Sequence, residues 1–484
     1  MTSRNVVHVK VDRTAKEPVN RQVYRQLRAV ILSGEYPPGM RLPSERQFAR
    51  DAGVGRVTIV RAFDQLAAEG FIESRVGAGT FVAVEIPDNV QDGLIRFRPQ
   101  LTEWGQRVLA TGTREERSSE LARPEIDFGF GRSFAENFPY DVWRRLLSRY
   151  LSTDDSMLSR YGSAAGFYPL RQAIAEYLVR ARGVRCTPGN VVVVSGAQQA
   201  IDILARLLLK PGDEVLVETP GYRDAYALFQ LHQARLTGMP VDDQGLPADE
   251  IPEKCQARIV FVTPTHQFPR GGTMPLARRL ALLAWARTRG AVIIEDDYDG
   301  DLRYEGSSLA ALQGVDEDGR VVYLGTFSKV LFPALRLGYL VLPDSLIAPF
   351  TQAKELVDRG APTLTQAAVA DFLTEGHFER HLRHLRRLYG EKRATLVQAL
   401  EDVLEDRVRF SPVAAGLHVM IHLDPGIDEL TLAHRAAERG VRIYPGAPYH
   451  LERPAPPSIL LGFSGLSDVD IIEGVRRLAA AWPD

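Results

Sequence analysis

The sequence predicts two folded parts of different classes: a small N-terminal domain of helices and a β-hairpin, and a large α/β domain around a mostly parallel sheet. Three observations support this prediction. The chain has 484 residues, enough for two or three domains that each bury a core. Residues 1–85 hold 13 basic and 9 acidic residues, so they carry +4 within a chain whose net charge is −2. From residue 126 onward, helical stretches alternate with short β-branched runs.

The overall composition excludes several classes of protein. Hydrophobic residues make up 45% and charged residues 25% of the chain, which are ordinary globular values and exclude wholesale disorder. The two cysteines, Cys186 and Cys255, lie far apart, so we expect neither a disulfide framework nor a metal site. The longest apolar run, residues 201–209, is interrupted by Asp202 and Arg206, and the first residues lack a secretory signal. We therefore expect a soluble cytoplasmic protein with no membrane segment.

The N-terminal part is predicted to form a winged helix-turn-helix. Residues 19–34 have helical spacing of apolar residues, and Ser44 is a helix N-cap candidate for a second helix that ends near residue 52. A third helix follows a glycine-containing turn and ends at Gly70. The apolar side of this third helix is predicted to comprise Val57, Val60, Phe63, Leu66 and Ala67. Two short strands, residues 71–74 and 80–84, flank a glycine-rich tip, and we place the domain at residues 1–85.

The rest of the chain divides into a linker and the large domain. Residues 86–125 show no clean periodicity and are predicted to be a linker with a short helix near residues 101–109. Residues 126–484 form the large domain, with predicted strands at 191–194, 214–218, 259–263, 291–295, 321–324 and 337–342. Small strands at 408–410 and 418–422, among helical stretches, predict a smaller C-terminal α+β lobe.

Several residues of the N-terminal domain are candidates for contacts with double-stranded DNA. Arg56 and Thr58 begin the third helix, where a recognition helix presents side chains to bases and phosphates. Arg46 lies near the start of the second helix, in a suitable place for a phosphate contact. Arg75 and the tip glycines could enter a minor groove. Any one of these arginines could simply be solvated, but the whole pattern predicts DNA binding.

Residues 19–82 resemble the N-terminal DNA-binding domain of the GntR family of bacterial regulators. The resemblance rests on residues 38–46, 53–58 and 70–82. It implies that the DNA-contacting positions include Arg46, Arg56, Thr58 and Gly77. Val60 stands where some relatives have another DNA-contacting arginine, and Arg61 lies one step round the helix. The base sequence that is read therefore stays open.

A lysine, an acid and a phenol in the large domain are candidates for holding an aldehyde cofactor. Lys329 follows a strand in a turn of small residues, where it could form a Schiff base if its surroundings lower its pKa. Pyridoxal phosphate needs an acid at its pyridinium nitrogen and a donor to its phenolate oxygen, and Asp296 and Tyr298 suit these tasks. Asp297 stays an alternative to Asp296 because the two are adjacent. A surface lysine and a solvated acidic turn are the alternatives for these residues taken singly.

Two further features are suited to a phosphate and an aromatic ring. Residues 194–199 follow a strand and open a helix, an arrangement in which free N–H groups and the helix dipole bind an anion. Arg336 could add a charged clamp. Tyr222 follows another strand, where its ring could stack on a pyridine.

Residues of about 126–484 resemble the fold-type I, aspartate-aminotransferase-like family of pyridoxal-phosphate proteins. The resemblance implies that Lys329 is the Schiff-base lysine, Asp296 the pyridinium partner and Tyr298 the phenolate donor. It makes Tyr222 the stacking ring and implies a homodimer, because Tyr161 matches a tyrosine that reaches the phosphate of the partner subunit. The phosphate is surrounded by Gly196, Ala197, Gln198, Thr326 and Arg336.

A GntR-like head on an aminotransferase-like body resembles the MocR-type regulators. Two departures from true aminotransferases point away from efficient turnover: Phe268 replaces a common asparagine, and Leu460 replaces a common arginine that binds the substrate carboxylate. Our first hypothesis is a transcription factor controlled by pyridoxal phosphate, alone or joined to a small amine or amino acid. The alternative is an active aminotransferase with an appended DNA-binding module, and residual transamination is compatible with the first hypothesis. A purely structural protein would leave the lysine, acid and phenol without a purpose.

The effector is open at this point. Relatives of this type respond to γ-aminobutyrate, taurine, D-alanyl compounds, ectoine derivatives, or the vitamer itself while controlling vitamin B6 synthesis. The missing arginine at position 460 favours the vitamer. The substitute cations for a carboxylate are Arg223, Arg439 and Arg442.

Overall fold

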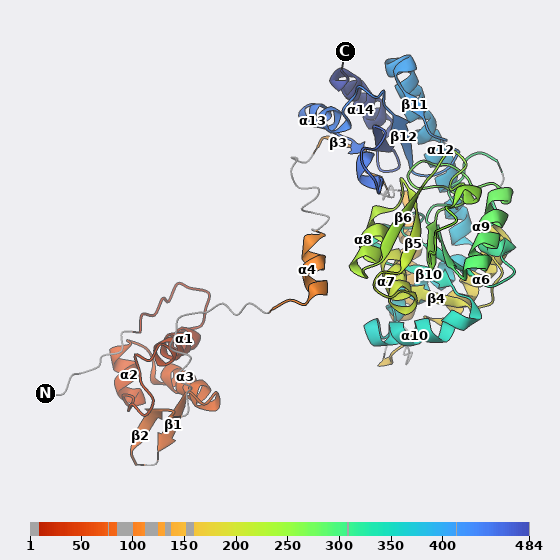
Figure 1. Ribbon diagram of the computed structural model, residues 1–484. Coiled ribbons are helices and arrows are strands. Elements are labelled where there is room, and N and C mark those ends of the chain that lie inside the picture. Colours follow the sequence, from red (N-terminus) through yellow and green to blue (C-terminus); the bar gives the residue numbers. More distant parts are fainter. Residues whose placement is uncertain are drawn as a thin grey trace. The chain divides into compact units, whose positions relative to one another are not determined.

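The computed structural model describes residues 9–75, 77–84, 100–111, 124–130, 137–151, 159–306, 309–412 and 414–483. The chain forms two compact units, Met1–Leu101 and Thr102–Asp484 (Figure 1). Of the predicted linker at 86–125, only residues 100–111 and 124–125 lie within the described residues.

The first unit is the predicted winged helix-turn-helix. The cap of its second helix is the predicted one, because the Ser44 side chain accepts a hydrogen bond from the Gln47 N–H. The hairpin strands pair antiparallel, with Ile72 opposite Val82. The helices and strands are α1 (Val19–Leu32), α2 (Glu45–Asp51), α3 (Arg56–Ala68), β1 (Ile72–Arg75) and β2 (Gly79–Val82).

The predicted apolar side of the third helix is partly wrong. Val57 is 66% exposed, and Ala67 is exposed as well. The side chains that α3 buries are Ile59, Ala62, Phe63 and Leu66. These four follow the spacing i, i+3, i+4, i+7, so they form one stripe, and α3 packs against α1. Because Val57 lies off this stripe, it faces solvent at the start of the helix.

The second unit is built on a seven-stranded sheet. Its strands are β4 (Val191–Val194), β5 (Glu214–Thr219), β6 (Arg235–Pro240), β7 (Ile259–Val262), β8 (Val292–Asp297), β9 (Val321–Thr326) and β10 (Gly338–Val341), in the order β4-β10-β9-β8-β7-β5-β6. Strand β10 is antiparallel to both of its neighbours, and the other pairs are parallel. The prediction of a mostly parallel sheet is confirmed, although β6 was not predicted.

Helices cover both faces of this sheet, which explains why strands β4, β5 and β7 are buried along their whole length. Figure 1 shows α7 and α8 on one side and α6 and α9 on the other. One face is covered by α7 (Ala197–Leu208), α8 (Arg223–Leu231) and α10 (Asp344–Asp358). The other is covered by α6 (Tyr168–Arg182), α9 (Leu276–Arg289), α11 (Thr363–Thr374) and α12 (His377–Leu404).

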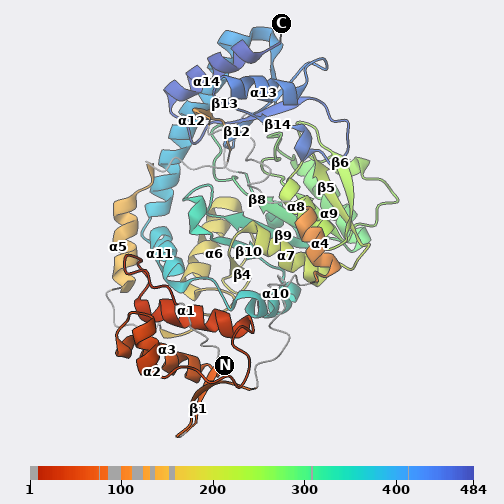
Figure 2. The same ribbon diagram turned by 90° about the vertical axis from the view of Figure 1, so that its left-hand side faces the viewer.

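The predicted C-terminal α+β lobe follows α12, which Figure 2 shows running from α11 to this lobe. The sheet of the lobe is antiparallel in the order β11-β12-β15-β14. The elements of the lobe are β11 (Arg409–Phe410), β12 (His418–His422), α13 (Glu429–Glu438), β13 (Val441–Arg442), β14 (Tyr444–Pro445), β15 (Ser458–Gly462) and α14 (Asp468–Ala481). Strand β13 pairs in parallel with β3 (Ile126–Asp127), which returns the start of the domain to the lobe.

The remaining helices are short. Helix α4 (Glu103–Ala110) begins after the cap Thr102, close to the helix predicted there, and packs against α8. Helix α5 (Tyr140–Leu151) packs against α11. Single 3-10 turns occur at Ala248–Glu250, Gln313–Val315, Pro333–Leu335, Glu405–Arg407 and Ala447–Tyr449. None of the helices among the described residues is long and apolar enough to cross a membrane.

Candidate functional site: a cofactor site at the strand ends and a DNA-binding surface

The candidate cofactor residues come together at one end of the large sheet, where ligands of α/β sheets gather. Lys329 lies in the turn directly after β9, and Asp296 is near the end of the adjacent strand β8. Strand β10 runs between β9 and β4, and its first residue, Gly338, approaches both Gly325 and Gly196. The lysine turn and the start of α7 are therefore neighbours.

The start of α7 has the geometry expected of the predicted anion site. Its first N–H groups have no partner within the helix, and among the described residues no side chain caps it. Arg336 Nη2 donates to the Ser195 carbonyl oxygen at 2.9 Å. Gly196 has φ +106°, and a Cβ there would lie 3.2 Å from the same guanidinium nitrogen. Glycine therefore allows the cation and the helix N-terminus to approach each other, which fits a phosphate group.

The other predicted phosphate and ring residues lie beside this anion site. Gln198, in the first turn of α7, donates from Nε2 to the Tyr222 hydroxyl at 2.9 Å. This bond joins the predicted stacking ring to the predicted phosphate site. Thr326 ends β9, and its Oγ1 accepts from the Ser328 N–H at 3.1 Å. Ala197 is the first residue of α7.

The two adjacent acids, Asp296 and Asp297, have different surroundings in the structure. Asp297 Oδ2 accepts from Arg182 Nε at 2.9 Å and Nη2 at 2.7 Å, and from the Tyr323 hydroxyl at 2.5 Å. Because neighbouring strand residues point to opposite faces, Asp296 projects away from this structural ion pair. The geometry therefore favours Asp296 as the partner for a pyridinium nitrogen.

The surroundings of Asp296 disfavour its ionised form. Burial, with added repulsion from Asp297 and Asp299, raises the pKa of Asp296 to about 8, although Lys329 opposes this shift. A cationic pyridinium nitrogen would supply the missing charge, so the acid fits pyridoxal phosphate.

Tyr298 belongs to a buried three-residue group that the sequence did not predict. Its hydroxyl lies 2.8 Å from His266 Nδ1, and this nitrogen lies 3.0 and 2.9 Å from the two Asp299 oxygens. Burial, with the charges of Asp299 and Asp296, raises the pKa of Tyr298 well above its usual value. His266 precedes Phe268 by two residues in the loop after β7, and this histidine in the cofactor-side loop was the signal available in the sequence.

The two departures from true aminotransferases lie in one apolar cluster. Phe268 is 8% exposed, and Leu460 is fully buried in the same cluster. The Phe268 ring centroid lies 5.6 Å from that of Tyr298, 6.1 Å from Tyr222 and 5.5 Å from Tyr449. The wall beside Tyr298 is thus apolar and aromatic.

The three arginines considered as substitutes for a carboxylate anchor occupy different places. Arg442 Nη1 lies 3.8 Å from Asp127, so a carboxylate of the protein already balances its charge. Arg439 is exposed after the end of α13. Arg223 begins α8, directly after Tyr222.

Tyr161 stands apart from the other predicted cofactor residues. It is 83% exposed, and the Arg359 guanidinium lies over its ring, 5.6 Å from the centroid. No hydrogen bond or ring contact within the described part of the chain joins it to the residues around Lys329.

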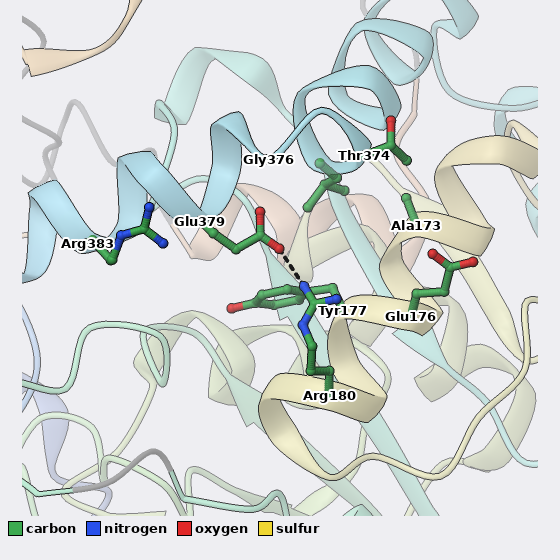
Figure 3. A pocket seen from close by; sticks show the side chains of 9 residues that line it. Ala173, Glu176, Tyr177, Arg180, Thr374, Gly376, Glu379 and Arg383 are labelled. Atoms are coloured by element: carbon green, nitrogen blue, oxygen red, sulfur yellow. Dashed lines mark hydrogen bonds and ion pairs between the residues drawn. The ribbon is translucent and has the colours of Figure 1, made fainter.

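A surface pocket of about 510 Å³ lies elsewhere on the second unit, between α6 and the start of α12 (Figure 3). Arg180 Nη2 and Glu379 Oε1 form an ion pair of 2.5 Å across it. Both signs of charge line this pocket, and none of the residues predicted from the sequence does.

The candidate DNA-binding residues lie on the first unit. The Arg56 side chain is 57% exposed at the start of α3 and pairs with Glu45 at 3.3 Å, while Thr58 is half-buried. Arg46 is exposed on α2. Val57, exposed beside Arg56, belongs to the same surface.

The hairpin carries the remaining DNA candidates. Arg75 Nη2 pairs with Glu73 at 2.6 Å, and its guanidinium lies 4.7 Å from the Phe81 ring centroid. Gly77 lies at the exposed tip with φ +76°. These exposed pairs are weak enough to exchange a carboxylate for a phosphate.

This fold and these two sites define a class of protein: a DNA-binding regulator with an aminotransferase-like domain. Residues 19–82 match the family "Bacterial regulatory proteins, gntR family", and residues 126–478 match "Aminotransferase class I and II". The chain belongs to the MocR-type regulators, which join these two domains.

Individual relatives agree with this assignment. The chain is 37% identical over 475 residues to the probable rhizopine catabolism regulatory protein MocR of Rhizobium meliloti, covering 98% of this chain and 95% of that one. It is 30% identical over 454 residues to the pyridoxine biosynthesis transcriptional regulator PdxR of Corynebacterium glutamicum, covering 94% and 93%.

The solved structures give the same fold. The kynurenine aminotransferase of Pyrococcus horikoshii, solved in complex with PMP, superimposes with a TM-score of 0.72 at 30% identity, covering 77% of this chain and 95% of that chain. The matched family and the fold support pyridoxal phosphate as the cofactor of the second unit.

Proposed function

We propose that this protein is a cytoplasmic, homodimeric transcriptional regulator whose affinity for operator DNA is set by pyridoxal phosphate bound at Lys329, alone or joined to a small amine. The observation that carries the proposal is the combination of cofactor residues and an apolar wall at the candidate site where the sheet strands end. This site keeps Lys329, Asp296 and Tyr298 in one place, yet Phe268 and Leu460 make its adjoining wall apolar. In the same chain, α3 presents Arg56 to solvent. We place the domains at residues 1–85 and 126–484, joined by the linker at 86–125.

Each residue near Lys329 has a separate task in this proposal. Lys329 binds the cofactor covalently, and Asp296 holds a proton at the pyridinium nitrogen. Tyr298 donates to the phenolate oxygen, and Tyr222, held by Gln198, stacks on the ring. The residues around the phosphate are Gly196, Ala197, Gln198, Thr326 and Arg336. When bound, pyridoxal phosphate supplies an electron sink and a carbon that accepts amines.

The apolar wall favours an effector that does not need a cation to bind a carboxylate. Leu460 offers no cation where aminotransferases commonly have arginine, and Arg442 is already paired with Asp127. We therefore propose pyridoxal phosphate itself as the first candidate signal and vitamin B6 synthesis as the first candidate target. The Corynebacterium relative, named as a pyridoxine biosynthesis regulator, supports this choice. Amines that lack a carboxylate are the next candidates.

Exposed apolar side chains support a homodimer. Tyr161 is 83% exposed and Leu356 is 90% exposed. The segments that carry them approach each other, because the Ser163 carbonyl lies close to Gly360. We propose that a second copy covers them and that Tyr161 reaches the phosphate of the partner subunit.

The alternative function is an active aminotransferase with an appended DNA-binding module. The observation that favours it is that Lys329, Asp296 and Tyr298, the groups which this chemistry requires, are all present. The experiment described next distinguishes the regulator from the aminotransferase.

The test combines absorption spectra with DNA binding. The visible spectrum of the protein loaded with pyridoxal phosphate is recorded while amines and amino acids are added one at a time. The same samples are titrated with DNA selected from a random library by the loaded protein, with Lys329→Ala as the control. A lasting shift of the visible band that changes DNA affinity names an amine effector. A change in affinity between loaded and unloaded protein, with no effect of any amine, names pyridoxal phosphate.

Two outcomes would contradict the proposal. A visible band that decays with amino acids to the pyridoxamine form at enzymatic rates, without an effect on DNA affinity, would establish the aminotransferase instead. DNA affinity that is equal for loaded, unloaded and amine-treated protein would remove the regulatory link.

A further inference from the structure

We propose that His266, held by Asp299, is a positioning residue that directs the phenol proton of Tyr298 toward the 3′-oxygen of the cofactor. The inference rests on the proposed binding of pyridoxal phosphate at Lys329. It adds a role for a residue that neither the sequence motifs nor the proposed function uses.

The distances favour a proton on Nδ1 of His266, and we assign it there. An ionised carboxylate only accepts hydrogen bonds, and both oxygens of Asp299 lie within 3.0 Å of His266 Nδ1. Nδ1 therefore carries the hydrogen in this assignment. The Tyr298 hydroxyl oxygen lies 2.8 Å from the same nitrogen, so it accepts a share of this N–H. The phenol proton is then left to bond to another acceptor.

Two acceptors compete for the phenol proton. Asp299 also lies within hydrogen-bond reach of Tyr298, but the hydrogen bond that it accepts from His266 makes it a weaker acceptor for the phenol. A phenolate oxygen on the cofactor carries negative charge and has no such donor from Phe268, which replaces the usual asparagine. The His266–Tyr298 pair therefore supplies the hydrogen bond on this side of the cofactor that the Phe268 side chain cannot make.

The imidazole is buried and lies against the backbone of Gly416. Its side chain is 2% exposed, and that of Asp299 is 1% exposed. Gly416, which precedes β12 with φ +90°, lies so close that a Cβ there would be 2.1 Å from His266 Cε1. The Gly416 N–H donates to the Leu302 carbonyl at 3.0 Å, which fixes this backbone against the ring. Glycine at position 416 thus allows the backbone before β12 to lie close to the His266 ring.

The other charged groups around the three residues come from separate elements. Asp296 belongs to β8, Tyr298 directly follows this strand, and Lys329 follows β9. From β12, the His418 ring lies 5.9 Å from the His266 ring, and burial lowers the pKa of His418 to about 3. His418 therefore stays neutral across the pH range of a cofactor titration.

The test compares two amides at position 266 in the full-length, cofactor-loaded protein. The amide of His266→Asn can place an N–H near the Nδ1 position, whereas His266→Gln carries its amide one methylene further out. The measurement is the midpoint of the pH-dependent change in visible absorption, together with the dissociation constant for pyridoxal phosphate. Tyr298→Phe and the double variant with His266→Gln complete a cycle. The control is His232→Asn, which breaks a histidine–aspartate pair of 2.7 Å with Asp202 elsewhere.

We expect the midpoint to rise by about one pH unit in His266→Gln, the size of one hydrogen bond to a charged oxygen. The direction follows because a donor to the 3′-oxygen stabilises its negative charge and so opposes protonation of the neighbouring Lys329 nitrogen. His266→Asn and His232→Asn should stay close to wild type. The double variant should shift no further than Tyr298→Phe alone, because His266 acts through Tyr298.

The outcomes separate this inference from the proposed function. An unshifted midpoint in folded, loaded His266→Gln overturns the inference alone. Equal shifts in the Asn and Gln variants also overturn it, because the imidazole would then only fill space. A wild-type protein that develops no visible band with pyridoxal phosphate overturns the proposed function, and this inference with it.

Discussion

Phe268 and Leu460 lie in the same buried apolar cluster, although one belongs to the loop after β7 and the other to β15 of the C-terminal lobe. At both positions the resemblance described above predicts a departure from true aminotransferases. Their shared cluster means that an amide and a cation are both replaced on one wall, next to Tyr298. The two substitutions therefore act as one change in the character of the site.

The cost of truncating these two side chains should not be additive. Phe268→Ala alone should lower the free energy of unfolding of the second unit by about 3–5 kcal/mol, and Leu460→Ala by about 2–5 kcal/mol, because both are buried. The double variant should differ from the sum by about 0.5–3 kcal/mol, since the residues share one cluster. Urea unfolding followed by tryptophan fluorescence measures all three. Strict additivity would show that the two side chains do not share contacts.

Lys329→Ala should abolish the covalent link to pyridoxal phosphate and leave weaker, non-covalent binding. The remaining affinity comes from the phosphate site, where the start of α7 and Arg336 are unchanged. Reduction with borohydride followed by mass spectrometry should add the cofactor mass to wild type and to the exposed control Lys210→Ala, but not to Lys329→Ala. An unchanged visible band in Lys329→Ala would refute the assignment of the lysine.

The stabilisation of the fold by pyridoxal phosphate should increase as the pH rises from about 6 to 8. Without the cofactor, the pKa of Asp296 is about 8, well above the usual 3.8 of an aspartate. Between these values the folded protein binds the proton and the unfolded chain does not, so this group lowers stability as the pH rises. A bound pyridinium nitrogen removes this loss by pairing with the carboxylate.

Calorimetry of loaded and unloaded protein measures this pH dependence. Asp296→Asn should reduce the rise with pH, because the titrating group is gone. Glu295, whose pKa burial raises to about 7, titrates in both proteins and cancels in the comparison. A rise of the same size in Asp296→Asn would assign the effect to another group.

Arg56→Ala should weaken operator binding by about 1–3 kcal/mol and relax specificity, if this residue reads a base. The stability of the first unit should change little, because the exposed pair with Glu45 at 3.3 Å contributes at most about 1 kcal/mol. The control is Arg25→Ala on α1, which breaks a similar exposed pair with Glu17 at 3.0 Å. Fluorescence anisotropy at matched salt gives both affinities, and wild-type affinity for Arg56→Ala would exclude the role.

Leu356→Asp should weaken the proposed homodimer at least about tenfold, the effect of about 1.4 kcal/mol. Its 90% exposure in the single chain means that the folded monomer should tolerate the change. Val469→Asp on α14, at a position that is 75% exposed, is the matched control and should leave the association unchanged. Analytical ultracentrifugation over a concentration series measures both, and equal association of the two variants would contradict the proposed surface.

Local signals predicted most of the regular structure. The Ser44 cap and the β-branched runs at 191–194 and 259–262 lie in the expected elements, because capping and uninterrupted burial leave direct traces in the residues. Strand β6 was missed because Arg235–Pro240 is only half-buried at the sheet edge and lacks a continuous apolar run. Val57 was placed on the wrong face of its helix because the packing of α3 against α1 selects the stripe.

The sequence by itself determined the classes of the two domains and predicted which residues hold a cofactor, because both depend on residue type and spacing along the chain. Only the tertiary structure showed that Arg182, far away in sequence, forms an ion pair with Asp297 and not with Asp296, which favours Asp296 as the proposed cofactor partner. It also decided that His266 adjoins Tyr298 and that Phe268 and Leu460 share a cluster. The physical reason is that hydrogen bonds and close packing join residues from distant segments, and a single sequence does not record which segments meet.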